Sequence, residues 1–223
     1  MILYRPVKSN RINQGFGENK ACVDTDIFGN IVRPISVVTA AGFCPVGYSR
    51  FYTTIGMKGH NGYDAAAWHG EPVYYNADFK GWMRTEHDQD GGLGVDVVSY
   101  EPILQCTEIN CWEKHYVKVR FWHGLQVLGW DKKEVLPGDP VMRADSSGAS
   151  SGDHLHWAPK WCDKNGVGIH SDNGYQGAFN PNRFYDERFI IDVLGRERVQ
   201  YRTIDLLNQV IFLLRKQVGD ILN

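Results

Sequence analysis

Histidine and acidic residues occur in this sequence at spacings that suit metal binding, and the first such pair is His60 and Asp64 in the segment HNGYD. A separation of four residues puts both side chains on one side of the chain, in a helix or in an extended strand. Gly62 lies between them and argues against a helix. One imidazole and one carboxylate suit a zinc ion. A surface histidine beside an unrelated aspartate would give the same pattern.

A second pair, His154 and His156, follows a loop of small residues, SSGASSG at residues 146–152. Alternate residues of a β-strand share a face, so both rings would point the same way while Leu155 points into the core. One ring can then bind a metal ion, and the other lies close enough to touch a metal-bound water molecule. Two solvated histidines are the alternative.

His123 ends an alternating segment, residues 116–123, that predicts a β-strand. Strand periodicity places it on the face of Val119 and Phe121. A lone histidine in this setting is more often a core or rim residue than a ligand. The other histidines fit no ligand spacing, and we interpret them as surface or structural residues: His69, His87, His115 and His170.

The segments around these residues read as short β-strands separated by glycine turns. A long irregular stretch, at about residues 19–56, is expected to be an insertion over the core, because loops of this length usually carry function or pack locally. Extended segments are expected at residues 72–75, 95–100, 116–123 and 154–158, with a short strand and a glycine turn within residues 9–18.

The chain changes character near residue 196, after which it has no proline and one glycine. Apolar residues are spaced alternately three and four apart, the pattern of a coiled-coil helix. β-Branched residues in one set of positions and mostly leucine in the other favour two parallel helices, which predicts a homo-oligomer. Docking onto the chain's own core or onto a partner is the other interpretation. The positions are Ile204, Leu207, Ile211, Leu214, Val218 and Ile221.

Bulk properties limit the classes of function. The 223 residues suffice for one well-buried domain with an accessory segment. A net charge of −2 without a basic face gives no reason to expect nucleic acid as a partner. No stretch approaches the ~20 apolar residues that span a bilayer. The first residues lack the pattern of a signal peptide, so we expect synthesis in a cytoplasm without export by the usual route.

The five cysteines form no C-x-x-C pair, which argues against a structural zinc knuckle. We expect mostly reduced thiols. In an oxidising compartment Cys22 with Cys44, or Cys106 with Cys111, could close loops.

Taken together, three segments resemble the lysostaphin/LytM-type zinc endopeptidases: GHNGYDAAAWHGEPVYY, RFWHG and GDPVMRADSSGASSGDHLHW. That family carries H-x-x-x-D, a later isolated histidine, and H-x-H after a loop of small residues, in this order. The segment INQGFGE resembles the start of the same catalytic domain, and GGLGVDVVSY its glycine turn and following strand. The resemblance covers about residues 10–160, interrupted by the insertion.

The resemblance implies that Zn²⁺ is bound by His60, Asp64 and His156. Three protein ligands leave one position for water, as in catalytic zinc sites. The ion would polarise the scissile carbonyl and lower the pKa of the bound water toward ~7.

The resemblance also implies two catalytic histidines, His123 and His154. His154 is the candidate general base, and His123 would position the water or stabilise the oxyanion. A tyrosine near the metal can steady the oxyanion in the family, and Tyr52 lies at about the right distance before His60. Asp153 replaces the usual proline before H-L-H, and a carboxylate there would raise the pKa of His154.

The fold implied by the resemblance is mainly β, with an antiparallel sheet as the floor of a substrate groove, and a C-terminal α-helix follows it here. We expect an endopeptidase domain over residues 1–185, with the insertion at about 19–56, and a helical segment over residues 186–223. The implied activity is zinc-dependent hydrolysis of peptide bonds in the stem or cross-bridge of bacterial peptidoglycan.

Lack of an export signal and of a separate wall-binding module favours a phage product. It would be an endolysin released at lysis or a virion-borne tail enzyme, fixed in an assembly by the C-terminal helix. Two alternatives remain open: a catalytically inert tail protein on the same fold, and a zinc carboxypeptidase acting on terminal D-Ala-D-Ala, whose first His and Asp are normally further apart.

Overall fold

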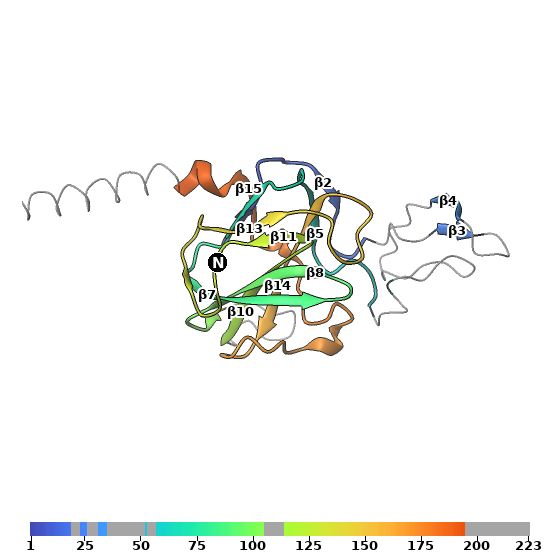
Figure 1. Ribbon diagram of the computed structural model, residues 1–223. Helices are drawn as coiled ribbons and strands as arrows, with labels where there is room; N and C mark the ends of the chain where they lie inside the picture. Colours follow the sequence, from blue (N-terminus) through green and yellow to red (C-terminus); the bar gives the residue numbers. More distant parts are fainter. Residues whose placement is uncertain (19–22, 26–30, 35–51, 53–56, 105–113, 195–223) are drawn as a thin grey trace, which may run out of the picture.

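A computed structural model describes residues 1–18, 23–25, 31–34, 52, 57–104 and 114–194 of the chain (Figure 1). Most of the predicted insertion, both predicted cysteine pairs and all six apolar positions of the predicted C-terminal helix lie outside these ranges. Within them, no helix has the length and apolar character needed to cross a membrane.

An antiparallel sheet of eight strands forms the centre of the molecule. Its order is β12-β7-β8-β10-β14-β5-β2, and β9 pairs with β10 off this path. The bounds are β2 Ile12–Gln14, β5 Tyr63–Ala66, β7 Gly81–Asp88, β8 Gly92–Ser99, β9 Ile103–Leu104, β10 Lys114–Trp122, β12 Glu134–Val135 and β14 His154–Cys162.

A smaller antiparallel sheet, β11-β13-β6, packs on one face of the large one. Val73, Val141 and Met142 of the small sheet meet Phe121 and Trp157 of the large sheet in a core from which solvent is excluded. Apolar residues on alternate positions of the strands therefore account for the two layers. The bounds are β6 Pro72–Tyr74, β11 Gly124–Val127 and β13 Pro140–Ala144.

The remaining elements are short. Strand β1 pairs in parallel with β15, which crosses the predicted domain boundary at residue 185, and β3 pairs with β4. Residues 190–194 are helical. The bounds are β1 Leu3–Arg5, β3 Val23–Thr25, β4 Ile31–Pro34, β15 Tyr185–Phe189, and the 3-10 turns η1 Ser171–Asn173 and η2 Pro181–Arg183.

The prediction of a mainly β, antiparallel fold that ends in a helix is confirmed. Strand β14 runs further than predicted, through Pro159 to Cys162. Proline lacks a backbone N–H and is tolerated at sheet edges. Because β5 pairs with β14 only as far as Trp157, Pro159 already lies beyond that neighbour, and the strand can continue.

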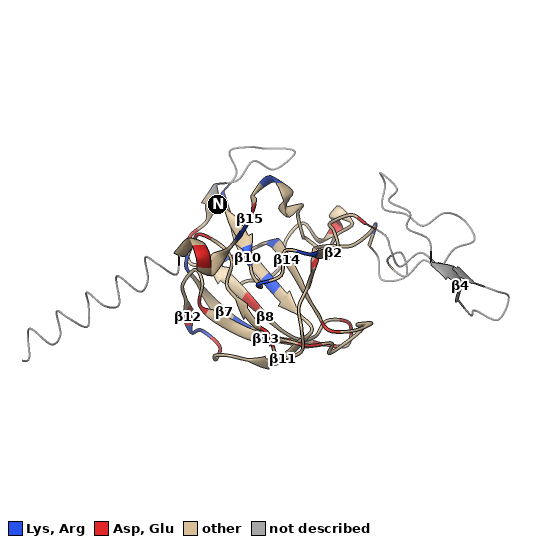
Figure 2. Ribbon diagram, turned by 90° about the horizontal axis from the view of Figure 1, so that it is seen from above, with Lys and Arg blue, Asp and Glu red and all other residues tan. Residues whose placement is uncertain are grey.

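One face of the large sheet packs on the core, and the opposite face, here called the outer face, carries its polar side chains. Strand register arranges these residues in rows. Asp64 and His156 are partners in one row, and Arg120 and Asp96 are partners in the next. Lys118 and Lys160 are partners in a third row. Figure 2 shows basic positions of β10 and β14 beside an acidic position of β8 within this sheet.

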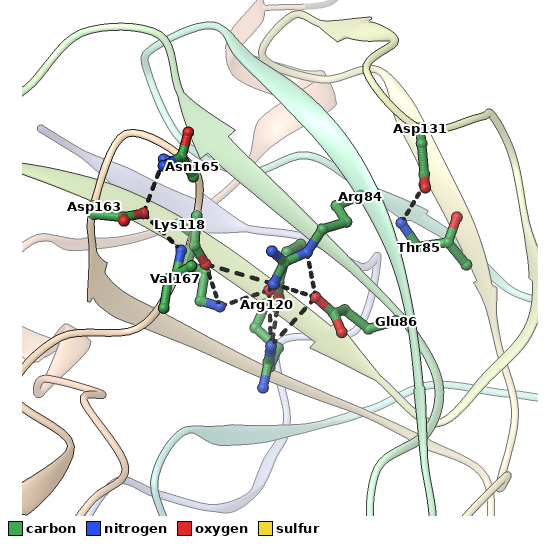
Figure 3. A network of polar contacts seen from close by, with 11 residues as sticks. Arg84, Thr85, Glu86, Lys118, Arg120, Asp131, Asp163, Asn165 and Val167 are labelled. Atoms are coloured by element: carbon green, nitrogen blue, oxygen red, sulfur yellow. Dashed lines mark hydrogen bonds and ion pairs between the residues drawn. The ribbon is translucent and has the colours of Figure 1, made fainter.

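Asp96 is the centre of a buried ionic cluster on the outer face. Figure 3 labels its partners Arg84, Lys118 and Arg120. Arg120 donates to both of its carboxylate oxygens, at 2.7 and 2.8 Å, and Lys118 donates at 2.8 Å. Arg84 adds a longer bond of 3.3 Å. Burial alone would raise the pKa of Asp96, but Arg120 and Lys118 outweigh it and hold this pKa well below its usual range. The carboxylate therefore stays charged in the folded protein.

Lys160 borders this cluster and is 5% exposed. Burial lowers its pKa to about 7, and Arg120 acts in the same direction. Between that value and the ordinary 10.5, the unfolded chain binds a proton that the folded chain lacks, so stability rises with pH through this window. We expect Lys160→Met to remove this rise and to stabilise the protein by about 1–3 kcal/mol at pH 6, because an unpaired buried charge is lost.

Urea unfolding at several pH values would measure this effect. Lys164→Met is the matched control, since Lys164 is exposed. An unchanged pH dependence in Lys160→Met would contradict the assignment.

Candidate active site

Three side-chain atoms converge at the edge of the outer face: His60 Nε2, Asp64 Oδ1 and His156 Nδ1. The two nitrogens lie 2.9 Å apart, and each lies 3.0 Å from the carboxylate oxygen. His60 and His156 are buried, and Asp64 is nearly so. The three residues predicted as metal ligands are therefore together in space.

Strand pairing brings these residues together from distant parts of the chain. Asp64 on β5 is the antiparallel partner of His156 on β14, so their side chains share the outer face. Tyr63 and Trp157, the next pair, have ring centroids 5.3 Å apart in the core, which fixes the register. His60 precedes β5, and its backbone N–H donates to the Glu18 carbonyl at 2.8 Å.

The donor set fits a zinc ion. Two imidazole nitrogens and one carboxylate oxygen are the ligand types of catalytic zinc sites, which keep a fourth position for water. A triangle with edges of 2.9–3.0 Å has a common point roughly 2.1 Å from each corner, the Zn–N and Zn–O distance typical of proteins.

The protonation states also favour a cation at this point. Burial alone would raise the pKa of Asp64, but His60 and the hydrogen bond from His156 outweigh it and place this pKa well below its usual range. Burial lowers the pKa of His156 to about 4, against the opposing effect of Asp64. At neutral pH the group thus offers an ionised carboxylate and a neutral His156, the forms that bind metal.

His60 is oriented by a backbone carbonyl. Its Nδ1 lies 3.1 Å from the oxygen of Gly15, just after β2. A carbonyl oxygen can only accept, so Nδ1 carries the proton and donates, and Nε2 faces Asp64 and His156. A metal-binding histidine commonly donates its other ring N–H to such a backbone carbonyl.

His154 and His123 lie directly beside the donor group. Their ring centroids are 4.6 Å apart, and Nε2 of His154 is 3.7 Å from Asp64 Oδ1. Each Nδ1 lies 2.7 Å from a backbone carbonyl, that of Gly152 for His154 and that of Ser147 for His123. By the same reasoning both Nδ1 atoms donate, which leaves each Nε2 as the ring nitrogen that faces the donor group and can accept a proton.

The face predicted for His123 was wrong. Strand β10 ends at Trp122, and His123 has a φ of 65°, in the left-handed region. Val119 and Phe121 stay in the core, while the His123 ring turns to within 6.2 Å of His156. Strand periodicity holds only while the backbone is extended, so it fails at the residue that leaves the strand. Burial lowers the pKa of His123 and so favours the neutral ring, although the hydrogen bond to Ser147 acts in the opposite direction.

Tyr52 is also placed near the donor group. Its ring centroid is 6.2 Å from that of His60, and its hydroxyl accepts a 2.8 Å bond from Gln14 Nε2 on β2. Burial, followed by the charge of Asp64, raises the pKa of Tyr52, so the phenol keeps its proton. A protonated hydroxyl is what an oxyanion-binding role requires.

Gly62 lies against the donor group and leaves no room for a side chain. A Cβ there would lie 2.5 Å from the Trp157 carbonyl oxygen and 2.8 Å from His156 Cε1. We expect Gly62→Ala to displace the His156 ring, to lower zinc affinity at least ~10-fold and to destabilise the fold by about 1–3 kcal/mol. Competition with a chromogenic chelator and thermal unfolding would measure both effects.

Gly168→Ala is the control for this change, because nothing lies within 4 Å of a Cβ at that position. Equal zinc affinity in the two variants would contradict the described packing of Gly62 on His156.

A second group of metal-type donors within the described residues comprises His69, Asp145 and Asp153. His69 Nδ1 lies 2.9 Å from Asp145 Oδ1, and His69 is largely exposed. His69 fitted no ligand spacing in the sequence, because Asp145 and Asp153 lie about 80 positions further along the chain. His115, predicted to be structural, is buried beside Trp161 at 5.3 Å between ring centroids.

The groups that orient the site histidines and Tyr52 were not predicted from the sequence. They are main-chain carbonyls of Gly15, Ser147 and Gly152, and the side chain of Gln14. A backbone carbonyl leaves no mark in residue type, so no sequence signal could reveal the first three. Cys162 is a free, buried thiol, and burial raises its pKa to about 12.

Fold and site together describe an antiparallel β protein with a buried His-Asp-His donor group and two flanking histidines. No protein-family model and no curated protein sequence matches the chain. Among solved structures, it is similar to the catalytic domain of lysostaphin from Staphylococcus simulans, at 18% identity over 57% of this chain and 79% of that one, with a TM-score of 0.42.

Two further solved structures are similar. A mutant catalytic domain of the prophage-encoded M23 protein EnpA from Enterococcus faecalis is 20% identical over 55% of this chain and 76% of that one, with a TM-score of 0.39. A zinc-containing peptidase from Vibrio cholerae is 18% identical over 78% of this chain and 40% of that one, with a TM-score of 0.44. At such identities and scores, the chemistry of this chain is judged from its own side chains.

Proposed function

We propose that this protein is a zinc-dependent endopeptidase that hydrolyses peptide bonds in the stem or cross-bridge of bacterial peptidoglycan. The observation that carries the proposal is the triangle of His60 Nε2, Asp64 Oδ1 and His156 Nδ1 with two further histidines, His123 and His154, beside it. Zinc, when bound, supplies a Lewis acid and an activated water.

The residues around the donor group have separate tasks in this proposal. His154 Nε2, on the Asp64 side of the group, takes the proton of the attacking water and returns it to the leaving amine. His123, whose ring centroid lies 4.6 Å from that of His154, orients the water through its unprotonated Nε2, and it would donate to the oxyanion only after gaining a proton there. Tyr52, protonated and held by Gln14, is placed to steady the oxyanion.

Peptidoglycan is proposed as the substrate because the motifs resemble the lysostaphin/LytM-type enzymes. Extended peptides rich in glycine or D-alanine would lie along the outer face of the sheet, next to the donor group. We propose further that the chain is a phage product, either an endolysin or a virion-borne enzyme that acts on the cell wall, with its C-terminal segment engaging a second copy or a virion partner.

The test is digestion of purified sacculi that differ in cross-bridge chemistry, with zinc content measured on the same protein and product masses determined. We expect one zinc ion per chain and new chain ends within stem or cross-bridge peptides. Bound zinc without any cleavage would favour an inert structural protein. Loss of terminal D-alanine alone would favour a carboxypeptidase.

A further inference from the structure

Lys160 lies on the same strand and the same face as the metal-donor residue His156. Four residues separate them on β14, which corresponds to roughly 13 Å at the rise of a β-strand. The Lys160 side chain is 5% exposed, its ammonium is not among the fully buried polar atoms, and none of the hydrogen bonds and ion pairs of the described residues involves it. A mostly buried ammonium that forms no ion pair and still reaches solvent is available to an anionic ligand.

The carboxylate nearest to Lys160 is already used by other cations. Both oxygens of Asp96 accept from Arg120, and one of them also accepts from Lys118 and Arg84. Lys118, the cross-strand partner of Lys160, also donates to the Gly166 carbonyl at 3.0 Å. No hydrogen bond or ion pair among the described residues therefore neutralises Lys160, while Glu86 pairs with Arg84 and Arg120 in the same cluster.

The turn around Gly166 covers the outer face beyond this cluster. A Cβ on Gly166 would lie 2.8 Å from Val98 Cγ2 and 3.5 Å from the Trp82 ring, so the turn rests directly on β7 and β8. Figure 3 shows Asp163, Asn165 and Val167 of this turn beside Lys118. Lys160 thus lies between the metal-donor group and the segment that closes this face.

We propose that Lys160, with Arg120 beside it, forms a subsite for a carboxylate of the peptide substrate, three or four residues from the scissile bond. This inference rests on the proposed endopeptidase function and specifies its substrate class: peptides with a free acidic side chain or chain end at that distance. A bound carboxylate would favour the charged form of Lys160, and charge-assisted bonds of this kind are the strong ones.

Two synthetic peptides that differ in one group test the subsite with the wild-type protein. One carries a free carboxylate three or four residues from the scissile bond, and the other carries a carboxamide there. We expect kcat/KM to be about tenfold or more higher for the carboxylate peptide, with the difference in KM. Equal values for the two peptides would overturn the subsite and leave the proposed function intact.

Variants of Lys160 test whether this side chain causes the preference for the carboxylate peptide. Lys160→Met is expected to lose the preference for the carboxylate peptide, whereas Lys160→Arg retains it. Lys164→Met, which removes an exposed lysine of the neighbouring turn, should behave as wild type. A preference that survives in folded Lys160→Met would overturn the assignment. If that variant does not fold, the wild-type comparison decides alone.

Binding separates this inference from the proposed activity. Calorimetry with zinc-loaded His154→Ala, which should bind without turnover, is expected to show tighter binding of the carboxylate peptide by about tenfold. Selective binding without any cleavage by the wild type would support the subsite and refute the endopeptidase. Cleavage by the wild type together with equal binding of the two peptides would refute the subsite and support the endopeptidase.

Discussion

Replacing His60 or His156 by alanine is expected to abolish zinc binding and hydrolysis together. Each supplies one of three donors that lie 2.9–3.0 Å from one another, so its loss leaves two protein ligands. The drop in zinc affinity should exceed the ~10- to 100-fold loss typical when only an outer partner of a ligand is removed. Elemental analysis after dialysis and turbidity loss of sacculi would measure the two effects.

His87→Ala is the matched control, since His87 is an exposed histidine of β7 in the same sheet. It should retain both zinc and activity. If His60→Ala and His156→Ala bound zinc as tightly as this control, the three atoms would not be the metal site, and the proposed function would lose its basis.

Replacing His154 by alanine is expected to separate metal binding from turnover. His154 Nε2 is 3.7 Å from Asp64 Oδ1, outside the group of three donors yet within reach of a water bound there. Zinc content should therefore stay at the wild-type level, while kcat falls by about 10²- to 10⁴-fold, the usual contribution of a general base. Added imidazole should restore part of the lost rate.

The pH profile distinguishes a base from a residue that only supports the fold. In His154→Ala the shape of the pH profile of kcat should differ from that of the wild type, and the thermal unfolding temperature should stay close to that of the wild type. A variant that loses zinc in parallel with activity would show that His154 acts as a ligand or a structural residue instead.

Sequence patterns predicted the large sheet well wherever one face is buried. A strand that packs one face on a core needs apolar residues at alternate positions, and residues 116–123 show this alternation. The apolar residues of β8 and β14 fit the same requirement. What the sequence could not supply was the pairing of strands distant in the chain, such as β5 with β14. The continuation of β14 through Pro159 depends on where its neighbour ends, which is a property of the assembled sheet.

The ligand residues were recognisable because side-chain type and order carry the metal chemistry. His60, Asp64 and His156 could be named from spacing and resemblance, and the structure brings their donor atoms together. The orientation of His123 could not be predicted, because a single left-handed residue turns its ring away from the face that periodicity assigns. The unpaired Lys160 was equally hidden, since its burial depends on strands that meet only in the fold.

Three histidine rings of this centre are oriented by hydrogen bonds to main-chain carbonyls. No point mutation can delete the oxygen of Gly15, Ser147 or Gly152, because every residue type carries the same peptide group. A mutation can therefore disturb the orientation of these rings only by changing the shape of a loop, for example at Gly152, whose φ is 155°. A saturation screen should accordingly find intolerance at glycines and loop lengths rather than at neighbouring polar side chains.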